Sequence, residues 1–521
     1  MKQSFISRLT IIVLITSMLL VSLSSCGGDV TTTVKKPETT LGPGETPGTS
    51  LPSPEVIYPE QIKGMKEVTD GSVIEFIYVE ASNGTYTGDS IWVDPESGEL
   101  DDVDNAVIER NNKITEDLGV QISSFGVDSI APSGLQEHCK SVFDAQLPDI
   151  DVYCGYQYYD ISLASLKHLY NLNDLVNQNG DTLINIENDY WATNYINSIT
   201  YNDYVYWVTG DLSLRYTGGL YCTFVNTEIY DTRVKAAYGG KTIYQIVSDG
   251  NWTMDTMLAM ADLADDDADG NGKITEGEVA GFVYEDNDIW DGLAFGCQVE
   301  FGKKVRNPNG TDQITVNLHL DQKAKDFAKY CDQIYKSTYS LKVLGDDSRN
   351  MMPYFANGFS LFVVNKLFQS AVWLSDMENF AIVPTPKLNQ GQKNYASGCH
   401  DSLTLFGISK YSDVPEASAA TLELMAFYAS ELVTPVFYEK YILGGRTVRD
   451  DESVEMIKLI RKGFDSDFVA AWSASINNIV HYYRIPTQCA NYASIFQYNA
   501  KRWPSALTKL LEALEKAAIE E

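Results

Sequence analysis

The chain has 521 residues, and its 39 Lys and Arg against 71 Asp and Glu give a formal net charge of −32. This balance excludes a nucleic-acid-binding protein, because neutralising phosphates needs clustered basic residues. With 44% hydrophobic and 12% aromatic residues the chain can bury a large core, so disorder throughout is excluded and two or more lobes are expected.

Residues 1–25 have the features of an export signal. A basic start is followed by an apolar stretch over residues 9–20, and small residues precede a cysteine. The tetrapeptide Leu23-Ser24-Ser25-Cys26 resembles the bacterial lipobox, in which the cysteine is acylated and becomes the first residue of the mature protein. We therefore expect Cys26 to carry a lipid anchor, with a plain signal peptide as the alternative.

Residues 26–60 are predicted to be a tether between the lipid and a folded domain. The segment holds six of the 17 prolines and almost no large apolar side chain, so it cannot bury enough surface to fold. No later apolar run approaches the length of a membrane span, so we expect the remaining chain to form a domain held outside the membrane.

From about residue 68 onward, strand-like and helix-like patterns alternate. Strands are predicted at 73–79, 120–122, 149–153, 221–225, 359–364, 380–383 and 403–408. Helices are predicted at 106–118, 162–176, 416–429, 453–462 and 506–519. The early order of strand, helix, strand favours parallel pairing, so the fold class is predicted to be α/β.

The cysteines indicate neither zinc nor a disulfide framework. Seven remain after Cys26, they are widely scattered, and none forms a C-x-x-C pair. Buried free thiols are the expected state.

Several short phrases resemble, in the same order, extracellular solute-binding protein family 1, the sugar-binding lipoproteins of ABC importers related to maltose-binding protein. They are Asn105-Ala106 through Asn111, Leu147-Pro148-Asp149, Leu172-Asn173-Asp174-Leu175, Gly210-Asp211, Trp252-Thr253, Phe355 with Gly358, Ile382 through Lys387, Gln392 with Tyr395, and Arg449-Asp450 before Ser453. Each phrase alone is weak, and the shared order across 68–521 carries the resemblance.

The resemblance implies a two-lobed, periplasmic-binding-protein-like fold of type II, with a hinge and a cleft between the lobes. On this basis lobe one is placed at 61–216 plus 396–440, and lobe two at 217–395 plus 441–521. Two facing crevices at the carboxyl ends of strands can close over a small solute.

Candidate ligand-binding residues are aromatic platforms and a carboxylate, since sugars have an apolar face and a rim of hydroxyls. Tyr156 and Tyr158 follow a predicted strand, where rings have no core to fill, and ordinary packing is the alternative for both. The resemblance implies that Trp191 and Asp211 lie near the crevice, and that Phe368 stands where a related protein has a stacking Trp. Trp472 is a further candidate, with core packing as its alternative.

Residues 267–278 resemble the twelve-residue EF-hand calcium loop. The predicted calcium ligands are Asp267, Asp269, Asn271, the carbonyl of Lys273, Thr275 and Glu278. A second frame starts at Asp265 and ends at Glu276, but only the first places Ile274 at the aliphatic anchor position. We expect one structural calcium ion, with a metal-free acidic turn as the alternative.

Catalytic patterns are scarce: the five histidines show no metal-ligand spacing, and there is no G-x-S-x-G or G-x-x-x-x-G-K sequence. We expect no enzyme but a monomeric, extracytoplasmic, lipid-anchored receptor that captures a carbohydrate and delivers it to separate ABC permease subunits. Two alternatives stay open: an anchored glycan hydrolase, since two carboxylates suffice for that chemistry, and a surface adhesion or interaction lipoprotein.

Overall fold

A computed structural model describes residues 57–80, 90–98, 100–128, 133–145, 150–343, 348–443 and 451–519. The export signal, Cys26 and most of the tether lie outside the described residues, as do the phrases Leu147-Pro148-Asp149 and Arg449-Asp450.

The first sheet has four strands in the order β11-β3-β1-β2. They are β1 (Val73–Glu80), β2 (Gln121–Asp128), β3 (Val152–Tyr156) and β11 (Thr404–Ile408). β1 pairs in parallel with both β2 and β3, whereas β11 runs antiparallel to β3. The parallel pairing predicted from the strand, helix, strand order is therefore confirmed, because α4 (Asp102–Leu118) joins β1 to β2.

The second sheet has five strands in the order β10-β4-β9-β5-β8. They are β4 (Tyr221–Asn226), β5 (Ala280–Tyr284), β8 (Ser340–Lys342), β9 (Ser360–Lys366) and β10 (Phe380–Pro384). Every residue of β4, β5 and β9 is buried, so the central strands have protein on both faces and read as continuous apolar runs.

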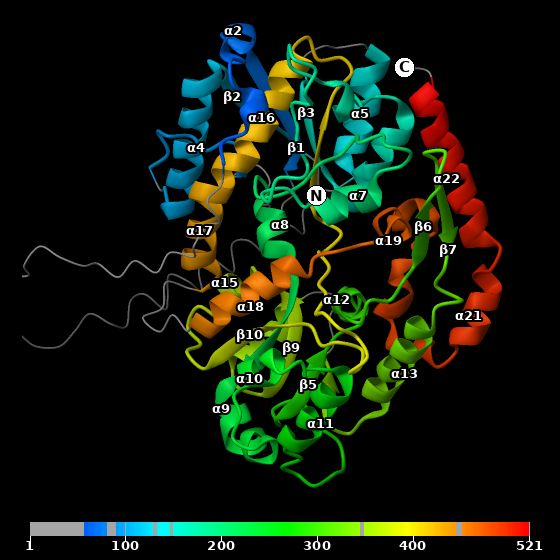
Figure 1. The fold of residues 1–521 in the computed structure, drawn as a ribbon. Helices are drawn as coiled ribbons and strands as arrows, with labels where there is room; N and C mark the ends of the chain where they lie inside the picture. The colour runs from blue at the N-terminus through cyan, green and yellow to red at the C-terminus, as the bar shows by residue number, and fades with distance from the viewer. Residues whose placement is uncertain are drawn as a thin grey trace, which may run out of the picture. The chain divides into compact units, whose positions relative to one another are not determined.

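Helices flank both sheets (Figure 1). In the part of the chain before β4 the structure has η1 (Glu60–Ile62), α2 (Lys66–Thr69), α5 (Gly134–Ala145), α6 (Gln157–Asp160), η2 (Ile161–Leu166), η3 (Leu172–Asp174), α7 (Thr193–Ile199) and α8 (Leu214–Gly219). Between β4 and β10 it has α9 (Thr227–Ile229), η4 (Tyr230–Val234), η5 (Lys235–Tyr238), α10 (Ile243–Ser248), α11 (Met254–Ala264), α12 (Ile289–Gly296), α13 (Gln322–Lys336), α14 (Ser348–Ala356), α15 (Gln369–Trp373) and the hairpin of β6 (Gly302–Arg306) with β7 (Asp312–Val316). After β11 follow α16 (Pro415–Tyr428), η6 (Ala429–Val433), α17 (Thr434–Phe437), η7 (Tyr438–Ile442), α18 (Asp451–Lys462), α19 (Phe468–Ala471), η8 (Ser473–Ile476), η9 (Val480–Arg484), α20 (Pro486–Cys489), α21 (Tyr492–Asn499) and α22 (Arg502–Ile519).

The start of α4 shows how local sequence sets an element. The Asp101 side chain accepts hydrogen bonds from the amides of Val103 and Asp104, and the Asp104 side chain returns a bond to the Asp101 amide. This reciprocal capping box satisfies amides that lack a partner inside the helix. Gly119 ends the helix in the left-handed region, with φ of 70°.

The chain passes between the two sheets more than once. α8 leads from the first sheet's segments into β4, and residues 385–403 return from β10 to β11. The strands predicted within 61–216 and 396–440 all lie in the first sheet, and those predicted within 217–395 lie in the second. α22, from the C-terminal segment, contacts η2 as well as the β6–β7 hairpin. The lobe boundaries themselves stay a prediction.

One predicted element is wrong. Residues 162–176 do not form a helix: η2 ends at Leu166, and Lys167 adopts the left-handed region with φ of 65°. The chain then runs extended, because Leu169 bridges Ser409 beside β11. The apolar residues at helical spacing are thus shared between a short 3₁₀ turn and an extended segment.

The seven cysteines between residues 139 and 489 are free and buried, which confirms the prediction of buried thiols. Among the described helices, none combines the length and the apolar character that a membrane crossing requires.

Candidate functional site

The candidate site lies beyond the carboxyl ends of the strands. In the first sheet β3 ends at Tyr156, opposite Thr404 at the start of antiparallel β11. In the second sheet β9 ends at Lys366, opposite Tyr221 at the start of antiparallel β4. Open α/β sheets bind ligands at such edges, since loops there present side chains without having to fill a core.

Seven titratable side chains near these edges form one charged network. They are Asp288, Asp291, Lys366, His400, Asp401, His481 and Arg484. Asp288 and Asp291 open α12 just after β5, and His400 and Asp401 lie on the return segment just before β11. The network therefore joins loops of the second sheet to a segment that leads into the first.

Asp288 is the acceptor at one end of the charged network. Its Oδ2 lies 2.5 Å from Lys366 Nζ and 2.7 Å from His400 Nε2. Burial alone would raise the pKa of Asp288, but the contacts with Lys366 and His400 outweigh it and hold the pKa well below its ordinary value. Asp288 is therefore a carboxylate at neutral pH.

Arg484 holds the other end of the network. Its Nη2 lies 2.6 Å from Asp291 Oδ2 and 2.7 Å from Asp401 Oδ2, so one guanidinium bridges two carboxylates. Burial would raise the pKa of Asp401, but contacts with His400, His481 and Arg484 lower it below its ordinary value. Burial raises the pKa of Asp291 despite the adjacent Arg484. One guanidinium thus offsets the charges of the buried Asp291 and of the partly exposed Asp401.

The ring of His400 is oriented by its neighbours. Its Nδ1 accepts the backbone amide of Ser402 at 3.1 Å and lies 2.7 Å from the Ser402 hydroxyl. A ring nitrogen that accepts an amide proton carries none itself, so the ring proton is on Nε2 and is donated to Asp288. The Ser402 hydroxyl also accepts Arg215 Nη1 at 3.0 Å, which extends the contacts to α8.

The predicted platforms Tyr156 and Tyr158 lie next to this network. Tyr156 is buried, with the Arg215 guanidinium 5.1 Å from its ring centroid. Tyr158 is more exposed: its ring stacks on His481 at 5.2 Å and its hydroxyl donates to Asn478 at 2.9 Å. Of the two, Tyr158 is the better placed to contact a solute, and both roles stay predictions.

The predicted stacking residue Phe368 lies where β9 leads into α15. Its amide donates to the carbonyl of Gly218 in α8 at 2.9 Å, and its side chain packs against the main core. It thus lies beside the passage between the sheets, and its contact with a ligand stays a prediction.

Three buried polar atoms near the network have no hydrogen-bond partner among the described residues: the Tyr221 hydroxyl, Asp291 Oδ1 and Arg215 Nε. Tyr221 is fully buried, and its pKa is raised well above the ordinary value by burial and then by Asp288 and Asp291. Because buried polar atoms are nearly always paired, these atoms point to a water molecule or a ligand group at this place.

The structure corrects the prediction for Trp191. The residue is 4% exposed in the core beside the first sheet, and its indole Nε1 donates to Glu423 at 2.8 Å. Glu423, on α16, also accepts the Tyr190 hydroxyl at 2.6 Å, and burial raises the pKa of Glu423 to about 7. Trp191 therefore packs in the core beside the first sheet and does not form a sugar platform.

The structure also corrects the prediction for Asp211. Its carboxylate is buried 2.5 Å from the guanidinium of Arg461 on α18. The rings of Tyr216 and Tyr438 lie 5.9 and 5.6 Å from the same guanidinium. Asp211 is thus the counter-ion of a buried arginine and not an acceptor for sugar hydroxyls.

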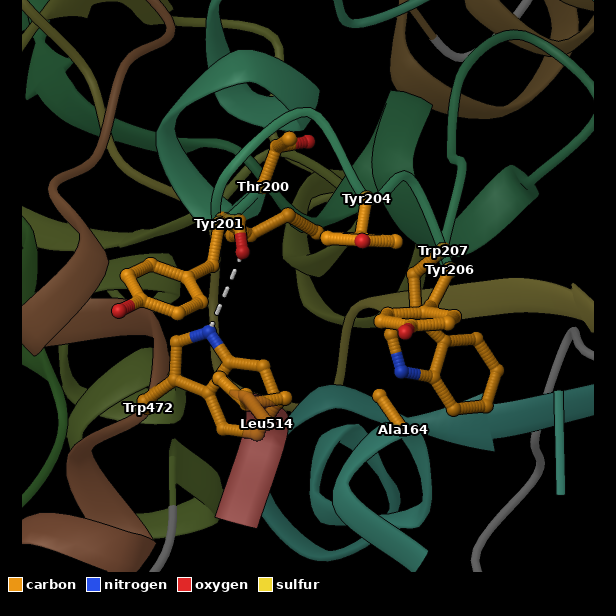
Figure 2. Close-up of a pocket in the computed structure, with 9 residues that line it drawn as sticks. Ala164, Thr200, Tyr201, Tyr204, Tyr206, Trp207, Trp472 and Leu514 are labelled. Atoms are coloured by element: carbon orange, nitrogen blue, oxygen red, sulfur yellow. Dashed lines mark hydrogen bonds between the residues drawn. The ribbon is translucent and has the colours of Figure 1, made fainter. Parts of the chain in front are cut away.

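Trp472 packs in the core, the alternative stated for it (Figure 2). Its ring stacks on Phe468 at 5.6 Å, and its Nε1 donates to the carbonyl of Ile199 at 3.4 Å. The cavity beside it, lined also by Tyr201 and Leu514, holds only about 10 Å³, which is room for one water molecule and not for a sugar. The assignment of Trp472 to ligand binding is wrong.

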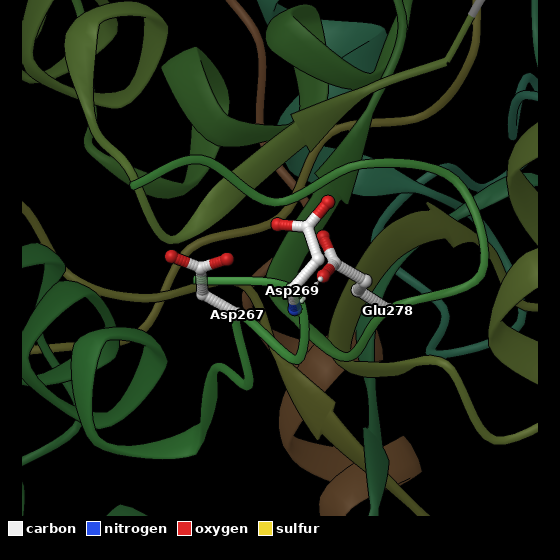
Figure 3. Close-up of side chains that lie close together, drawn as sticks. All are labelled: Asp267, Asp269 and Glu278. Atoms are coloured by element: carbon white, nitrogen blue, oxygen red, sulfur yellow. Dashed lines mark hydrogen bonds between the residues drawn. The ribbon is translucent and has the colours of Figure 1, made fainter. Parts of the chain in front are cut away.

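The loop at 267–278 gathers carboxylates as its motif predicts (Figure 3). Carboxylate oxygens of Asp267, Asp269 and Glu278 lie within 4.8 Å of one another, and Glu276 is not part of this group. α11 leads into the loop and β5 leaves it. This grouping fits the first of the two predicted frames, and calcium binding stays a prediction.

Backbone amides converge on the same carboxylates. The Gly272 amide donates to Asp267 at 2.7 Å and lowers its pKa, and the Thr275 amide donates to Glu278 at 2.8 Å and lowers the pKa of Glu278. Asn271 Oδ1 accepts the amide of Lys273 at 3.0 Å. The loop is thus ordered around ionised carboxylates.

No protein-family model and no curated protein sequence matches the chain. Among solved structures, a cyclo/maltodextrin-binding protein complexed with maltotetraose matches at 13% identity and a TM-score of 0.51, over 85% of this chain and 96% of that one. The galacto-N-biose-/lacto-N-biose I-binding protein of the ABC transporter from Bifidobacterium longum, in complex with lacto-N-biose, matches at 13% identity and a TM-score of 0.52, over 86% and 98% of the two chains. The chain therefore has the two-lobed α/β fold of these binding proteins, as the motif order predicted.

The charged network was not predicted, because its members are far apart in sequence. Arg484 is 193 residues from Asp291 and 83 residues from Asp401. The only local signal was the polar run around His400, just before a predicted strand.

We predict that Arg484→Met destabilises the protein by about 3–5 kcal/mol, since it leaves the buried carboxylate of Asp291 without its counter-ion. Chemical denaturation at pH 7 measures this loss. The lowered pKa of Asp401 means that its stabilising contribution is present above the ordinary carboxyl pKa and is lost at lower pH, so neutral pH shows the full effect. The control Lys329→Met removes an exposed pair with Asp326 and should cost at most about 1 kcal/mol. Equal effects of the two substitutions would contradict the role of Arg484.

Proposed function

We propose that this protein is a solute-binding receptor that captures a carbohydrate for an ABC importer. The observation that carries the proposal is the convergence of charged and aromatic side chains at the carboxyl ends of both sheets, in a chain with the fold of sugar-binding proteins. Three buried polar atoms without partners at the same place add support, because ligand hydroxyls could supply the missing hydrogen bonds.

The charged network suits a ligand rich in hydroxyl groups. The carboxylates of Asp288, Asp291 and Asp401 accept hydrogen bonds, whereas Lys366 and Arg484 donate hydrogen bonds. A sugar hydroxyl does both, so it can insert between such groups, and a hydrogen bond to a charged group contributes about 1.5–3 kcal/mol. Tyr158 would cover the apolar face of a sugar ring.

The proposed receptor works at the outer face of the membrane. The support is the lipobox at Leu23-Ser24-Ser25-Cys26, followed by a proline-rich tether. A lipid and a spacer of this kind would hold a monomeric receptor within reach of its permease subunits, to which it would pass the captured sugar.

We further propose that the loop at 267–278 binds one structural calcium ion. Asp267, Asp269 and Glu278 already gather their oxygens, and such a group of carboxylates suits a hard cation. Asn271, the carbonyl of Lys273 and Thr275 would complete the oxygen set. The ion would fix the connection between α11 and β5.

Carbohydrate binding is tested by calorimetry of residues 57–521 with mono- and oligosaccharides. We expect heat of binding with at least one oligosaccharide, which chromatography recovers uncleaved. Tyr158→Ala should weaken that binding about tenfold or more while the fold is kept, since 1.4 kcal/mol is a factor of ten. The control Tyr498→Ala removes a ring that is 69% exposed and lies outside the site, and it should not change the affinity. If amino acids or peptides bind and no sugar does, the carbohydrate assignment is wrong.

Calcium binding is tested by the melting temperature of chelator-treated protein. Added calcium should raise it in a concentration-dependent way, because the ion binds only the folded loop. Glu278→Ala should abolish the rise, whereas Glu276→Ala should leave it intact. An unchanged melting temperature in wild-type protein at millimolar calcium would show that the loop is only an acidic turn.

The lipid anchor is tested by membrane fractionation and metabolic lipid labelling of the full chain. Cys26→Ala should abolish labelling and leave either released protein or uncleaved precursor. Ser25→Ala, which keeps the cysteine, is the matched control. Persistent labelling and membrane association of Cys26→Ala would contradict the anchor.

A further inference from the structure

A hollow lined by residues of β1 and β2, here called the β1–β2 pocket, lies outside the charged network. Its volume is about 490 Å³, within the range of roughly 300–1,000 Å³ of small-molecule sites. Its walls include Tyr78 from β1, Trp92 from the segment that follows β1, and Tyr441 from η7. Leu214 also lines it, and the next residue, Arg215, contacts the charged network through Ser402. The pocket and the network are therefore neighbours along α8.

The described lining of the pocket carries three carboxylates and no basic side chain. They belong to Asp94, Asp101 and Asp104. Asp101 accepts the amides of Val103 and Asp104 and also the Tyr441 hydroxyl, and Asp104 accepts the Asp101 amide. Lys440, next to Tyr441, pairs instead with Asp102 at 3.0 Å. The charge of the pocket is thus negative, with two of its carboxylates committed to the start of α4.

Two groups of the pocket are available to a solute. Trp92 is 41% exposed, whereas the other described Trp residues are buried or partly buried. Asp94 is exposed, and in the described contacts its carboxylate accepts one bond, from the Glu96 amide to Oδ1 at 2.9 Å. A sugar ring needs a flat apolar surface to stack on and an acceptor for the hydrogen bonds of its hydroxyls. Trp92 offers the first and the carboxylate of Asp94 offers the second.

We propose that the β1–β2 pocket binds an uncharged glycosyl residue, with Trp92 as the platform and Asp94 as the acceptor, and that its carboxylates exclude anionic sugars. The proposal rests on the proposed function and deepens it by naming the ligand class. A uronate or sulfated sugar would bring a fourth negative group among three carboxylates, and such repulsion produces specificity.

Calorimetry with matched pairs of glycans tests the proposal, for example galacto-oligosaccharides against galacturono-oligosaccharides and gluco- against glucurono-oligosaccharides of equal length. We expect neutral members to bind and their uronate counterparts to bind at least tenfold more weakly. Trp92→Ala should weaken binding of the neutral glycan about tenfold, and Asp94→Asn should narrow the gap between the pair. Tyr498→Ala and Asp326→Asn, which alter exposed residues outside the pocket, are the controls and should change neither value.

A second readout needs no ligand. The fluorescence lost in Trp92→Phe reports on the pocket, and caesium should quench this component more than iodide does at equal concentration. Asp94→Asn should reduce the difference, because it removes one of the three charges. Equal quenching by the two ions would overturn the charge assignment.

The remaining outcomes separate this proposal from the proposed function. If a uronate binds as tightly as its neutral partner, or if Trp92→Ala leaves the affinity of a bound glycan unchanged, the pocket proposal is wrong and the receptor function stands. If no glycan of either kind binds and spermidine or choline does, both proposals fail, since an acidic aromatic pocket also suits cations.

Discussion

The paired burial of charges at the carboxyl ends of the strands is the constraint on which the site depends. Asp288 and Asp291 are almost removed from water, and an unpaired carboxylate there would cost several kcal/mol. Lys366 at the end of β9 and Arg484 at the end of η9 offset this cost. They can do so only where these ends of the chain meet α12 and the segment before β11, which carry the carboxylates. The electrostatics of the site therefore fix how loops from distant parts of the chain meet.

The same constraint makes the edge suitable for binding. The charged side chains of the network are paired with one another, and polar atoms without partners lie next to them. A ligand hydroxyl can therefore replace one contact of a charged group, which keeps its other contacts. The Asp211–Arg461 pair and the charged network have different roles on this view. Asp211 and Arg461 are enclosed by tyrosine rings and serve packing, whereas the charged network lies at the edge where ligands of this fold class are bound.

Local sequence patterns predicted the features that residues close in sequence determine. They failed for side chains whose environment is set by contacts with distant parts of the chain. Buried strands such as β4 and β9, and the calcium-type loop at 267–278, are set within a few residues, so periodicity and spacing identified them. Trp191 and Trp472 were misassigned because an aromatic residue near a predicted crevice looks the same in sequence whether it faces Glu423 in a core or a solute. Arg484 could not be found, since both of its partners are more than 80 residues away.

Hydrogen–deuterium exchange with and without a saturating oligosaccharide tests where the ligand binds. We expect slower exchange on binding at 156–160, 287–291, 400–403 and 478–484, the segments that carry the charged network and Tyr158. Exchange at 267–278 and at the amino ends of β1 and β2 should not change. Protection confined to other segments, with these four unchanged under saturating ligand, would contradict the placement of the site at the carboxyl ends of the two sheets.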